Sequence, residues 1–282
     1  METLSTIASL RALLRPHRAA GRTLGFVPTM GALHEGHLSL MRRAKAECDL
    51  AVASIFVNPT QFAPTEDLAR YPRDLEGDRR LCRSVGVDAL FAPTAAEMYR
   101  EGAATWVTQD DATARCLEGE HRPTHFRGVL TVCLKLFQIV QPDRAYFGQK
   151  DFQQALLVRR MVRDLDLPME LVVCPIVREA DGLAMSSRNR YLGADARRQA
   201  VSLWRGLDKA RAAVAVGERD AGRLADVIRS EIVAAGPCEI DYVAIADPET
   251  LAPVAVVERP VVALIAVRIA GTRLIDNLLL AP

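Results

Sequence analysis

The strongest constraint on the fold is an alternation of short apolar runs with segments of helical period along the first two thirds of the chain. Each run is long enough for a buried strand, and amphipathic spacing follows at 38–44, about 75–85, 127–140 and up to about 165. This rhythm is typical of a parallel sheet with helices on both faces, so the sequence predicts an α/β fold. The expected strands cover residues 24–27, 51–57, 89–91, 145–147 and 171–177.

After about residue 178 the rhythm changes. Two helices are expected over about 194–216 and 220–235, followed by strands near 239–246 and 261–268. We therefore predict two domains, residues 1–177 and a smaller C-terminal α+β domain over 178–282. In the first domain, leucines at helical spacing predict a helix over 3–15, and the polar, proline-containing stretch 60–74 predicts a long loop that is a candidate lid.

Two histidines and two glycines lie where the first long strand hands over to a helix, in the stretch 28–37. In an α/β sheet this is the carboxyl end of a strand, where ligands bind. A helix start offers N–H groups and a positive dipole end to a phosphate, and His34 and His37, three apart, share a face of the first turn. Surface histidines at a helix cap and a zinc pair are the alternatives, although no cysteine or third histidine lies nearby to complete a zinc site.

Neutral amides follow the second strand. Asn58 and Gln61 can bind hydroxyls and a carboxylate without neutralising the carboxylate, which matters if that carboxylate is a nucleophile. An ordinary Asn–Pro turn is the alternative.

A third motif, residues 148–154, repeats the strand, glycine and helix-start pattern. Lys150 would project from a helix N-terminus towards an anion, Asp151 would partner the dipole or ligand hydroxyls, and Gln154 lies one turn on. A capped helix with a solvated lysine is the alternative.

The fourth motif, residues 178–189, follows a strand at the predicted domain boundary. Asp181 and Gly182 form a turn signal, and Ser186, Ser187 and Arg188 offer two hydroxyls and a guanidinium that can wrap phosphates. A polar interdomain linker is the alternative.

Charge and cysteine usage exclude several classes. The 282 residues carry 36 Lys+Arg and 35 Asp+Glu, a net charge of +1, so neither nucleic acid nor a membrane surface is the expected main partner. The six scattered cysteines predict buried thiols, and with no secretion signal and no long apolar run we expect a cytoplasmic protein. Asp78 gives weak support for a magnesium ligand; we expect surface or loop histidines at 17, 121 and 125 and packing roles for Trp106 and Trp204.

In order and spacing, the four motifs resemble the His–x–Gly–His nucleotidylyltransferase superfamily and, within it, the pantothenate synthetase (pantoate–β-alanine ligase) family. The resemblance covers about residues 24–192 and includes 71–73, 125–129 and 141–143, with a further match at 273–277. Met185 stands where leucine is often found, a swap that should pack similarly. The resemblance implies a Rossmann-like sheet, a homodimer, and ATP-dependent joining of pantoate to β-alanine through a pantoyl adenylate, with release of AMP and pyrophosphate.

The resemblance also implies roles for individual residues. His37 would be the proton donor, with His34, Lys150 and Arg188 as further catalytic residues. ATP would enter with Mg²⁺, for which no protein ligand is assigned. Pantoate would contact Gln61, Gln154 and Asn58, and β-alanine would contact Gln61. The implied ATP-binding residues are Met30, Gly31, Ala32, Leu33, His34, Glu35, Gly36, His37, Gly148, Gln149, Lys150, Asp151, Val177, Met185, Ser186, Ser187 and Arg188.

Elementary chemistry is consistent with these roles. A carboxylate nucleophile is already ionised, so the barrier lies in charge that accumulates on the phosphates, which helix-start N–H groups and cations offset. Two rivals remain: an adenylyltransferase that moves AMP onto a phosphorylated acceptor, and a module that binds ATP without turnover.

Overall fold

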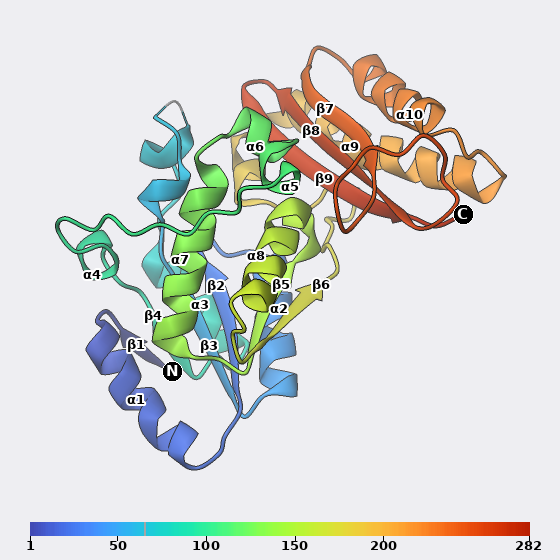
Figure 1. Cartoon of the computed structure of the whole chain (residues 1–282). Helices are drawn as coiled ribbons and strands as arrows, with labels where there is room; N and C mark the ends of the chain where they lie inside the picture. Colours follow the sequence, from blue (N-terminus) through green and yellow to red (C-terminus); the bar gives the residue numbers. More distant parts are fainter. Residues whose placement is uncertain (65) are drawn as a thin grey trace. The chain divides into compact units, whose positions relative to one another are not determined.

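A computed structural model describes residues 1–64 and 66–282 and divides into two compact units (Figure 1). The first unit consists of Met1–Gly148 and Gln154–Pro175, and the second of Gln149–Gln153 and Ile176–Pro282. The short segment Gln149–Gln153 therefore groups with the C-terminal part of the chain, although it directly follows a strand of the first unit. Each unit is described by itself.

The first unit contains a six-stranded parallel sheet with the strand order β1-β4-β3-β2-β5-β6. The chain runs from β2 outward through β3 and β4, then returns to β5 beside β2, so the order reverses between β2 and β5. Such a reversal opens a crevice at the carboxyl ends of the two strands, where α/β proteins bind ligands. The strands are β1 (Glu2–Leu4), β2 (Leu24–Thr29), β3 (Leu50–Ile55), β4 (Ala89–Phe91), β5 (Arg144–Gly148) and β6 (Glu170–Cys174).

Helices cover both faces of this sheet, as the alternation predicted. Successive strand residues point to opposite faces; Phe26 accordingly packs with α1 (Ile7–Ala19), α7 (His125–Val140) and α8 (Phe152–Asp164). Val27, the next residue, packs with α2 (Glu35–Glu47) and α3 (Leu75–Ser84). The α/β, Rossmann-like fold class is confirmed. Short helices lie between α3 and α7: α4 (Ala95–Met98), α5 (Ala112–Arg115) and α6 (Glu118–His121).

The helix expected over 3–15 begins later than predicted. Residues Glu2–Leu4 form β1, which pairs in parallel with Ala89–Phe91. The helix starts after Thr6, whose side chain accepts a hydrogen bond from the Ser9 N–H. The leucine spacing extends across this capping residue, so the spacing alone places the helix start too early.

The predicted loop over 60–74 contains two short 3-10 helices, η1 (Pro59–Gln61) and η2 (Asp67–Ala69). Thr65, within the candidate lid, lies outside the described residues. The lid remains a prediction.

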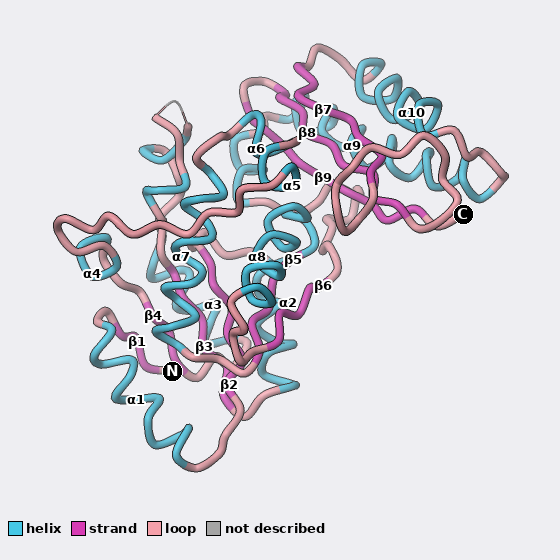
Figure 2. The backbone as a smooth tube through the Cα atoms, viewed as in Figure 1, coloured by secondary structure: helices cyan, strands magenta, loops and turns pink. Residues whose placement is uncertain are grey.

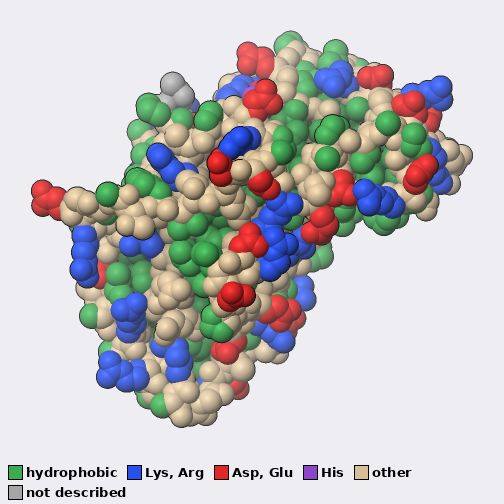
Figure 3. All heavy atoms as spheres, viewed as in Figure 1, with side chains coloured by type: hydrophobic (Ala, Val, Ile, Leu, Met, Phe, Trp, Pro, Cys, Tyr) green, Lys and Arg blue, Asp and Glu red, His purple; other side chains and the backbone are tan. Residues whose placement is uncertain are grey.

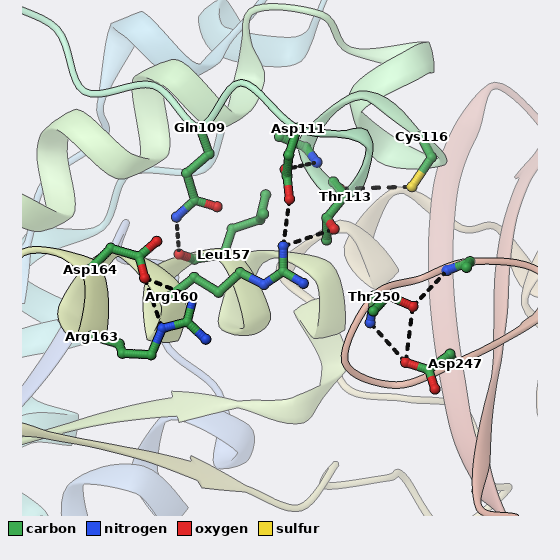
Figure 4. A network of polar contacts seen from close by, with 12 residues as sticks. Gln109, Asp111, Thr113, Cys116, Leu157, Arg160, Arg163, Asp164, Asp247 and Thr250 are labelled. Carbon is green, nitrogen blue, oxygen red and sulfur yellow. Dashed lines mark hydrogen bonds and ion pairs between the residues drawn. The ribbon is translucent and has the colours of Figure 1, made fainter.

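Helix α8 is hydrogen-bonded to α5 and to the segment that precedes it (Figure 4). The Arg160 guanidinium donates to an Asp111 carboxylate oxygen at 2.6 Å and to the Thr113 hydroxyl at 2.9 Å. The Gln109 side chain donates to the Leu157 carbonyl at 2.7 Å. These contacts hold the helix that begins beside Gln154.

The second unit contains an antiparallel sheet of the strands β7 (Glu239–Ala246), β8 (Val261–Ile269) and β9 (Thr272–Leu280), drawn in magenta in Figure 2. Helices α9 (Ala194–Ala215) and α10 (Ala221–Ala234) pack against each other and against this sheet around a shared apolar core. Two 3-10 helices, η3 (Gln149–Asp151) and η4 (Ser187–Tyr191), belong to the same unit.

Strand β9 is absent from the elements predicted from the sequence. Its buried positions include Asp276 and Asn277, which are 2% and 1% exposed. Because these buried side chains are polar, the hydrophobic pattern that marks a strand is broken at these two positions.

Acidic and basic side chains are both spread over the face shown in Figure 3. Among the described residues, no helix is long and apolar enough to cross a membrane.

Candidate active site

The loop that joins β2 to α2 has an unusual backbone. Gly31 and Ala32 have φ values of +81° and +51°, and for alanine this left-handed conformation is uncommon and strained. The Thr29 hydroxyl accepts a hydrogen bond from the Gly31 N–H at 3.2 Å. The neighbouring contacts must therefore supply the stability that keeps Ala32 in this conformation.

Asp78, in the first turn of α3, supplies it. One carboxylate oxygen accepts from the Ala32 N–H at 2.9 Å and the other from the Leu33 N–H at 2.8 Å. The side chain is 4% exposed, and a Cβ added to Gly31 would lie 2.8 Å from its Oδ2. From the sequence, Asp78 was only a weak candidate for a magnesium ligand. In sequence, an acidic residue in a first helical turn is usually explained as a partner of the helix dipole. Nothing in the sequence therefore indicated that Asp78 contacts a loop 46 residues earlier.

His34 and His37 lie together at the start of α2. His34 is the N-cap residue, and the two imidazole centroids are 4.1 Å apart. The His34 N–H lies 3.4 Å from His37 Nδ1, so Nδ1 is the acceptor and the neutral His37 ring carries its hydrogen on Nε2. The N–H groups of Glu35 and Gly36 come too early in α2 to bond within the helix. The predicted juxtaposition of two imidazoles with a helix start is therefore present.

Gln61, in η1, contacts the same loop. Its side-chain nitrogen donates to Met30 Sδ at 3.0 Å, and its side-chain oxygen accepts from Asn58 Nδ2 at 3.1 Å. Asn58 is 1% exposed; its Nδ2 also donates to the Gly128 carbonyl, and its oxygen accepts from the Tyr99 hydroxyl at 2.8 Å. The first and second motifs thus share one site in the first unit, with Asn58 orienting the Gln61 amide.

Helix α7 approaches η1 without an intervening side chain. A Cβ added to Gly128 would lie 2.4 Å from the Thr60 carbonyl oxygen and 2.7 Å from the Gln61 Cα. Glycine at this position lets the helix backbone touch the segment that carries Gln61.

His125, expected on the surface or in a loop, is instead buried in the first turn of α7. Its Nδ1 donates to the Gln61 carbonyl at 3.0 Å, and Arg122 donates to its Nε2 at 3.1 Å. Burial, together with the Arg122 charge, lowers the pKa of His125 to about 4, so the ring is neutral at physiological pH. Arg122 in turn forms an ion pair with Glu66 at 2.6 Å. No local sequence pattern marks this cluster, because its members come from separate segments.

The two tryptophans differ. Trp106, expected to be a packing residue, is 40% exposed with the Arg127 guanidinium 4.7 Å from its ring centroid. Trp204 packs against the core of the second unit, and the Arg178 guanidinium lies 3.9 Å from its ring.

In the second unit, the third motif is held by β9. Asn277 Nδ2 donates to the carbonyls of Gln149 and Lys150, both at 2.9 Å, and its Oδ1 accepts from the Gln149 side chain at 3.1 Å. The Lys150 side chain is half-buried. Gln154, the next predicted residue, lies in the first turn of α8 and belongs to the first unit.

The fourth motif is tied to the same strand. Arg178 forms a two-point ion pair with Asp276, at 2.6 and 2.9 Å, and donates to the Gly182 carbonyl at 3.1 Å. Burial raises the pKa of Asp276, and Arg178 opposes that rise. Further along, Ser186 caps η4 by accepting from the Arg188 N–H at 3.2 Å. The third and fourth motifs are therefore both joined to β9.

No group of three or more histidine, cysteine or acidic side chains that could hold a metal occurs in the part of the chain that the structure describes.

The fold and this site define a nucleotide-binding type of α/β protein, with a histidine pair at a helix start beside the reversal of strand order. The family model described as pantoate-beta-alanine ligase matches residues 2–279. A pantothenate synthetase from Acidobacterium capsulatum is 55% identical over 99% of this chain and 97% of its own, and one from Moorella thermoacetica is 54% identical over 99% of both. The chain therefore belongs to the pantoate–β-alanine ligase family.

Solved structures agree. The pantothenate synthetase of Thermus thermophilus has a TM-score of 0.96 at 49% identity over 100% of both chains. The pantoate-beta-alanine ligase of Francisella tularensis, described as complexed with beta-gamma ATP and β-alanine, has a TM-score of 0.83 at 34% identity over 99% of this chain and 97% of its own. The function predicted from the motifs, ligation of pantoate to β-alanine, is confirmed.

Proposed function

We propose that the chain performs this ligation with ATP in two steps, through a pantoyl adenylate. In the first, a pantoate carboxylate oxygen attacks the α-phosphorus of ATP, and the bond to the pyrophosphate oxygen breaks. In the second, the β-alanine amine, after losing a proton, attacks the acyl carbon, and AMP leaves. The naming of ATP and β-alanine as ligands of the Francisella tularensis relative supports this choice of substrates.

One observation carries the proposal: the His34–His37 pair stands at the N-terminus of α2, on a loop that Asp78 holds, where the strand order reverses. There the helix dipole and the Glu35 and Gly36 N–H groups suit a nucleotide phosphate. We assign the residues from Met30 to His37 to ATP. We assign the role of proton donor to His37: its Nδ1 accepts the His34 N–H, so the ring hydrogen lies on Nε2, where it can be donated to a phosphate oxygen in a hydrogen bond.

In this proposal Lys150 and Arg188, from the second unit, bind the negatively charged phosphates. Their neighbours make further contacts with the nucleotide. Cations aimed at oxygens that gain charge in the transition state lower its energy. These neighbours are Gln149, Asp151, Val177, Met185, Ser186 and Ser187 of the second unit, together with Gly148, which belongs to the first unit.

We assign pantoate to Gln61 and Gln154, with Asn58 acting at least through the Gln61 amide that it orients. A neutral amide binds a carboxylate without removing its charge, so the nucleophile keeps its reactivity. Gln61 also contacts β-alanine in this proposal. Closure of residues 60–74 over the site would protect the mixed anhydride from water.

Magnesium suits this chemistry as a partner of ATP. Mg²⁺ is usually bound through substrate phosphates and one or two carboxylates, and both Asp78 oxygens already accept main-chain N–H groups. The ion would neutralise phosphate charge, and most of its ligands would come from ATP.

The domain boundary at 177/178, a homodimer and a cytoplasmic location complete the proposal. Sedimentation of the purified chain tests the dimer.

Product analysis tests the reaction. Mass spectrometry after mixing the protein with ATP, magnesium, pantoate and β-alanine should detect pantothenate, AMP and pyrophosphate in equal amounts. A stable dinucleotide product would instead indicate adenylyl transfer to an acceptor. Pantoate-dependent exchange of pyrophosphate into ATP should also occur, and its absence would favour a module that binds ATP without turnover.

A further inference from the structure

The segment that carries Lys150 could be held in position by either of the two units. It follows β5 directly and leads into α8, both of which lie largely in the first unit. By its contacts, however, Gln149–Gln153 groups with the C-terminal unit. The contacts responsible come from β9.

Asn277 is the centre of these contacts. Both of its Nδ2 hydrogens are used, one on the Gln149 carbonyl and one on the Lys150 carbonyl, each at 2.9 Å. Its Oδ1 accepts from the Gln149 side chain at 3.1 Å. An amide offers two donors and one acceptor oxygen, so this side chain matches two successive carbonyls and a neighbouring donor.

The amide itself is rigidly placed. Asn277 is 1% exposed and pairs with Leu264 within the β8–β9 ladder, on the edge strand of the antiparallel sheet. Its own N–H donates to the Asp276 carboxylate at 2.8 Å, and Asp276 is held by the two-point ion pair with Arg178. The Lys150 backbone is thus bonded to a buried strand whose side chains have few alternative positions.

We propose that Asn277 is a positioning residue for Lys150, so that the C-terminal sheet sets the position of this lysine. The proposal rests on the assigned role of Lys150 in binding ATP phosphate. In this proposal Asn277 touches no substrate; it acts by fixing the Gln149 and Lys150 carbonyls, which lie on either side of the Lys150 Cα. The same strand holds Arg178 at the start of the fourth motif, so both nucleotide-binding segments of this unit share one support.

A double-mutant cycle tests the proposal. The rate of pyrophosphate release in single turnover, at saturating ATP and pantoate, is measured for the parent, Asn277→Ala, Lys150→Ala and the double variant. A misplacement of about 1 Å can lower a rate by roughly 100-fold, so Asn277→Ala alone should lower it at least roughly 10-fold. Once Lys150 is alanine, Asn277 has no lysine side chain to position, so the same change should alter the rate by less than about twofold, which is within the error of additivity.

A second variant and a control separate positioning from general stability. Asn277→Asp keeps the size and the acceptor oxygen but sets a second oxygen against two carbonyls, so it should behave like Asn277→Ala; it replaces that variant in the cycle if Asn277→Ala fails to fold. Asp241→Asn weakens a 2.6 Å ion pair with Arg273 in the same sheet, away from η3. It should lower the melting temperature and leave the rate unchanged.

The outcomes are distinct. An equal loss in both Lys150 backgrounds would show that Asn277 supports the fold in general and would overturn the proposal, as would a normal rate for both Asn277 variants. A normal rate for Lys150→Ala would instead remove Lys150 from the assigned ATP site, and the positioning role would fall with it.

Discussion

The loop that leads into the His34–His37 pair (the histidine loop) and the segment that carries Lys150 are held in opposite ways. The histidine loop turns main-chain N–H groups inward, and a carboxylate, Asp78, accepts them. The lysine segment turns main-chain carbonyls inward, and an amide, Asn277, donates to them. In each case the main-chain groups that point inward, donors or acceptors, determine which type of buried side chain holds them, because an unpaired buried polar group destabilises the fold.

The two supports also differ in their origin. Asp78 lies 46 residues from the loop that it holds and in the same unit, whereas Asn277 lies 127 residues from Lys150, on the last strand of the chain. The histidine pair therefore depends on the parallel sheet and its helices, and the lysine depends on the C-terminal sheet. Four substitutions would break or sharpen this contrast.

The largest effect is expected from His37→Ala, which removes the reactive group of the first region and leaves its support intact. Adenylate formation should fall by roughly 100-fold or more, the range of general acid catalysis, with little change in melting temperature. Stopped-flow measurement of adenylate formation checks this. His121→Ala, the loss of an exposed imidazole on α6, is the matched control. A near-normal rate for His37→Ala would exclude His37 from the mechanism.

Asp78→Asn attacks the support and leaves both imidazoles in place. The new NH₂ group would face an N–H of Ala32 or Leu33, so one buried donor loses its acceptor, at a loss of about 2 kcal/mol of unfolding free energy. Urea denaturation measures that loss, and adenylate formation should slow as Ala32 relaxes. Glu76→Gln makes the same chemical change on an exposed side chain of α3. If Asp78→Asn were as stable and active as that control, a carboxylate would not be needed here.

A third region tests whether inward-pointing main-chain carbonyls are generally held by side-chain donors. The Gln61 carbonyl is held by neutral His125, whose pKa is lowered to about 4 in the folded chain from 6.5. Between these values the unfolded state binds more protons, so stability should fall as pH decreases from 6.5 to about 4. The slope contributed by one such group approaches about 1.4 kcal/mol per pH unit.

His125→Gln keeps a donor for the carbonyl but cannot titrate, so its stability should depend less on pH in this window. Parallel urea titrations of the two proteins give the difference. Identical slopes would mean that His125 is protonated in the folded protein.

The smallest effect is expected from Gln154→Ala, in a helix that begins in one unit and continues in the other. Loss of one hydrogen bond should raise the KM for pantoate by roughly threefold to tenfold, and the KM for ATP much less. Steady-state kinetics with each substrate varied checks this. Gln138→Ala, an exposed glutamine on α7, is the control. Equal shifts in both KM values would contradict a pantoate contact.

Much of the architecture follows from the sequence, because alternating apolar runs and helical spacing are local signals. The parallel sheet, its two helical layers and the histidine pair at a helix start all came from such patterns. The residues that support the site could not be predicted in this way, because Asp78, His125 and Asn277 contact segments that are distant from them in the sequence. The buried polar residues Asp276 and Asn277 also interrupt the apolar pattern of β9. The strand that holds Lys150 was therefore not predicted from the sequence.

Gly128 has a consequence for sequence drift. A Cβ at position 128 would lie 2.4 Å from the Thr60 carbonyl oxygen, so any side chain there must displace the segment that carries Gln61. Saturation mutagenesis of this codon under selection for growth without supplied pantothenate should return glycine almost alone, even though glycine has no side chain with which to contact a substrate.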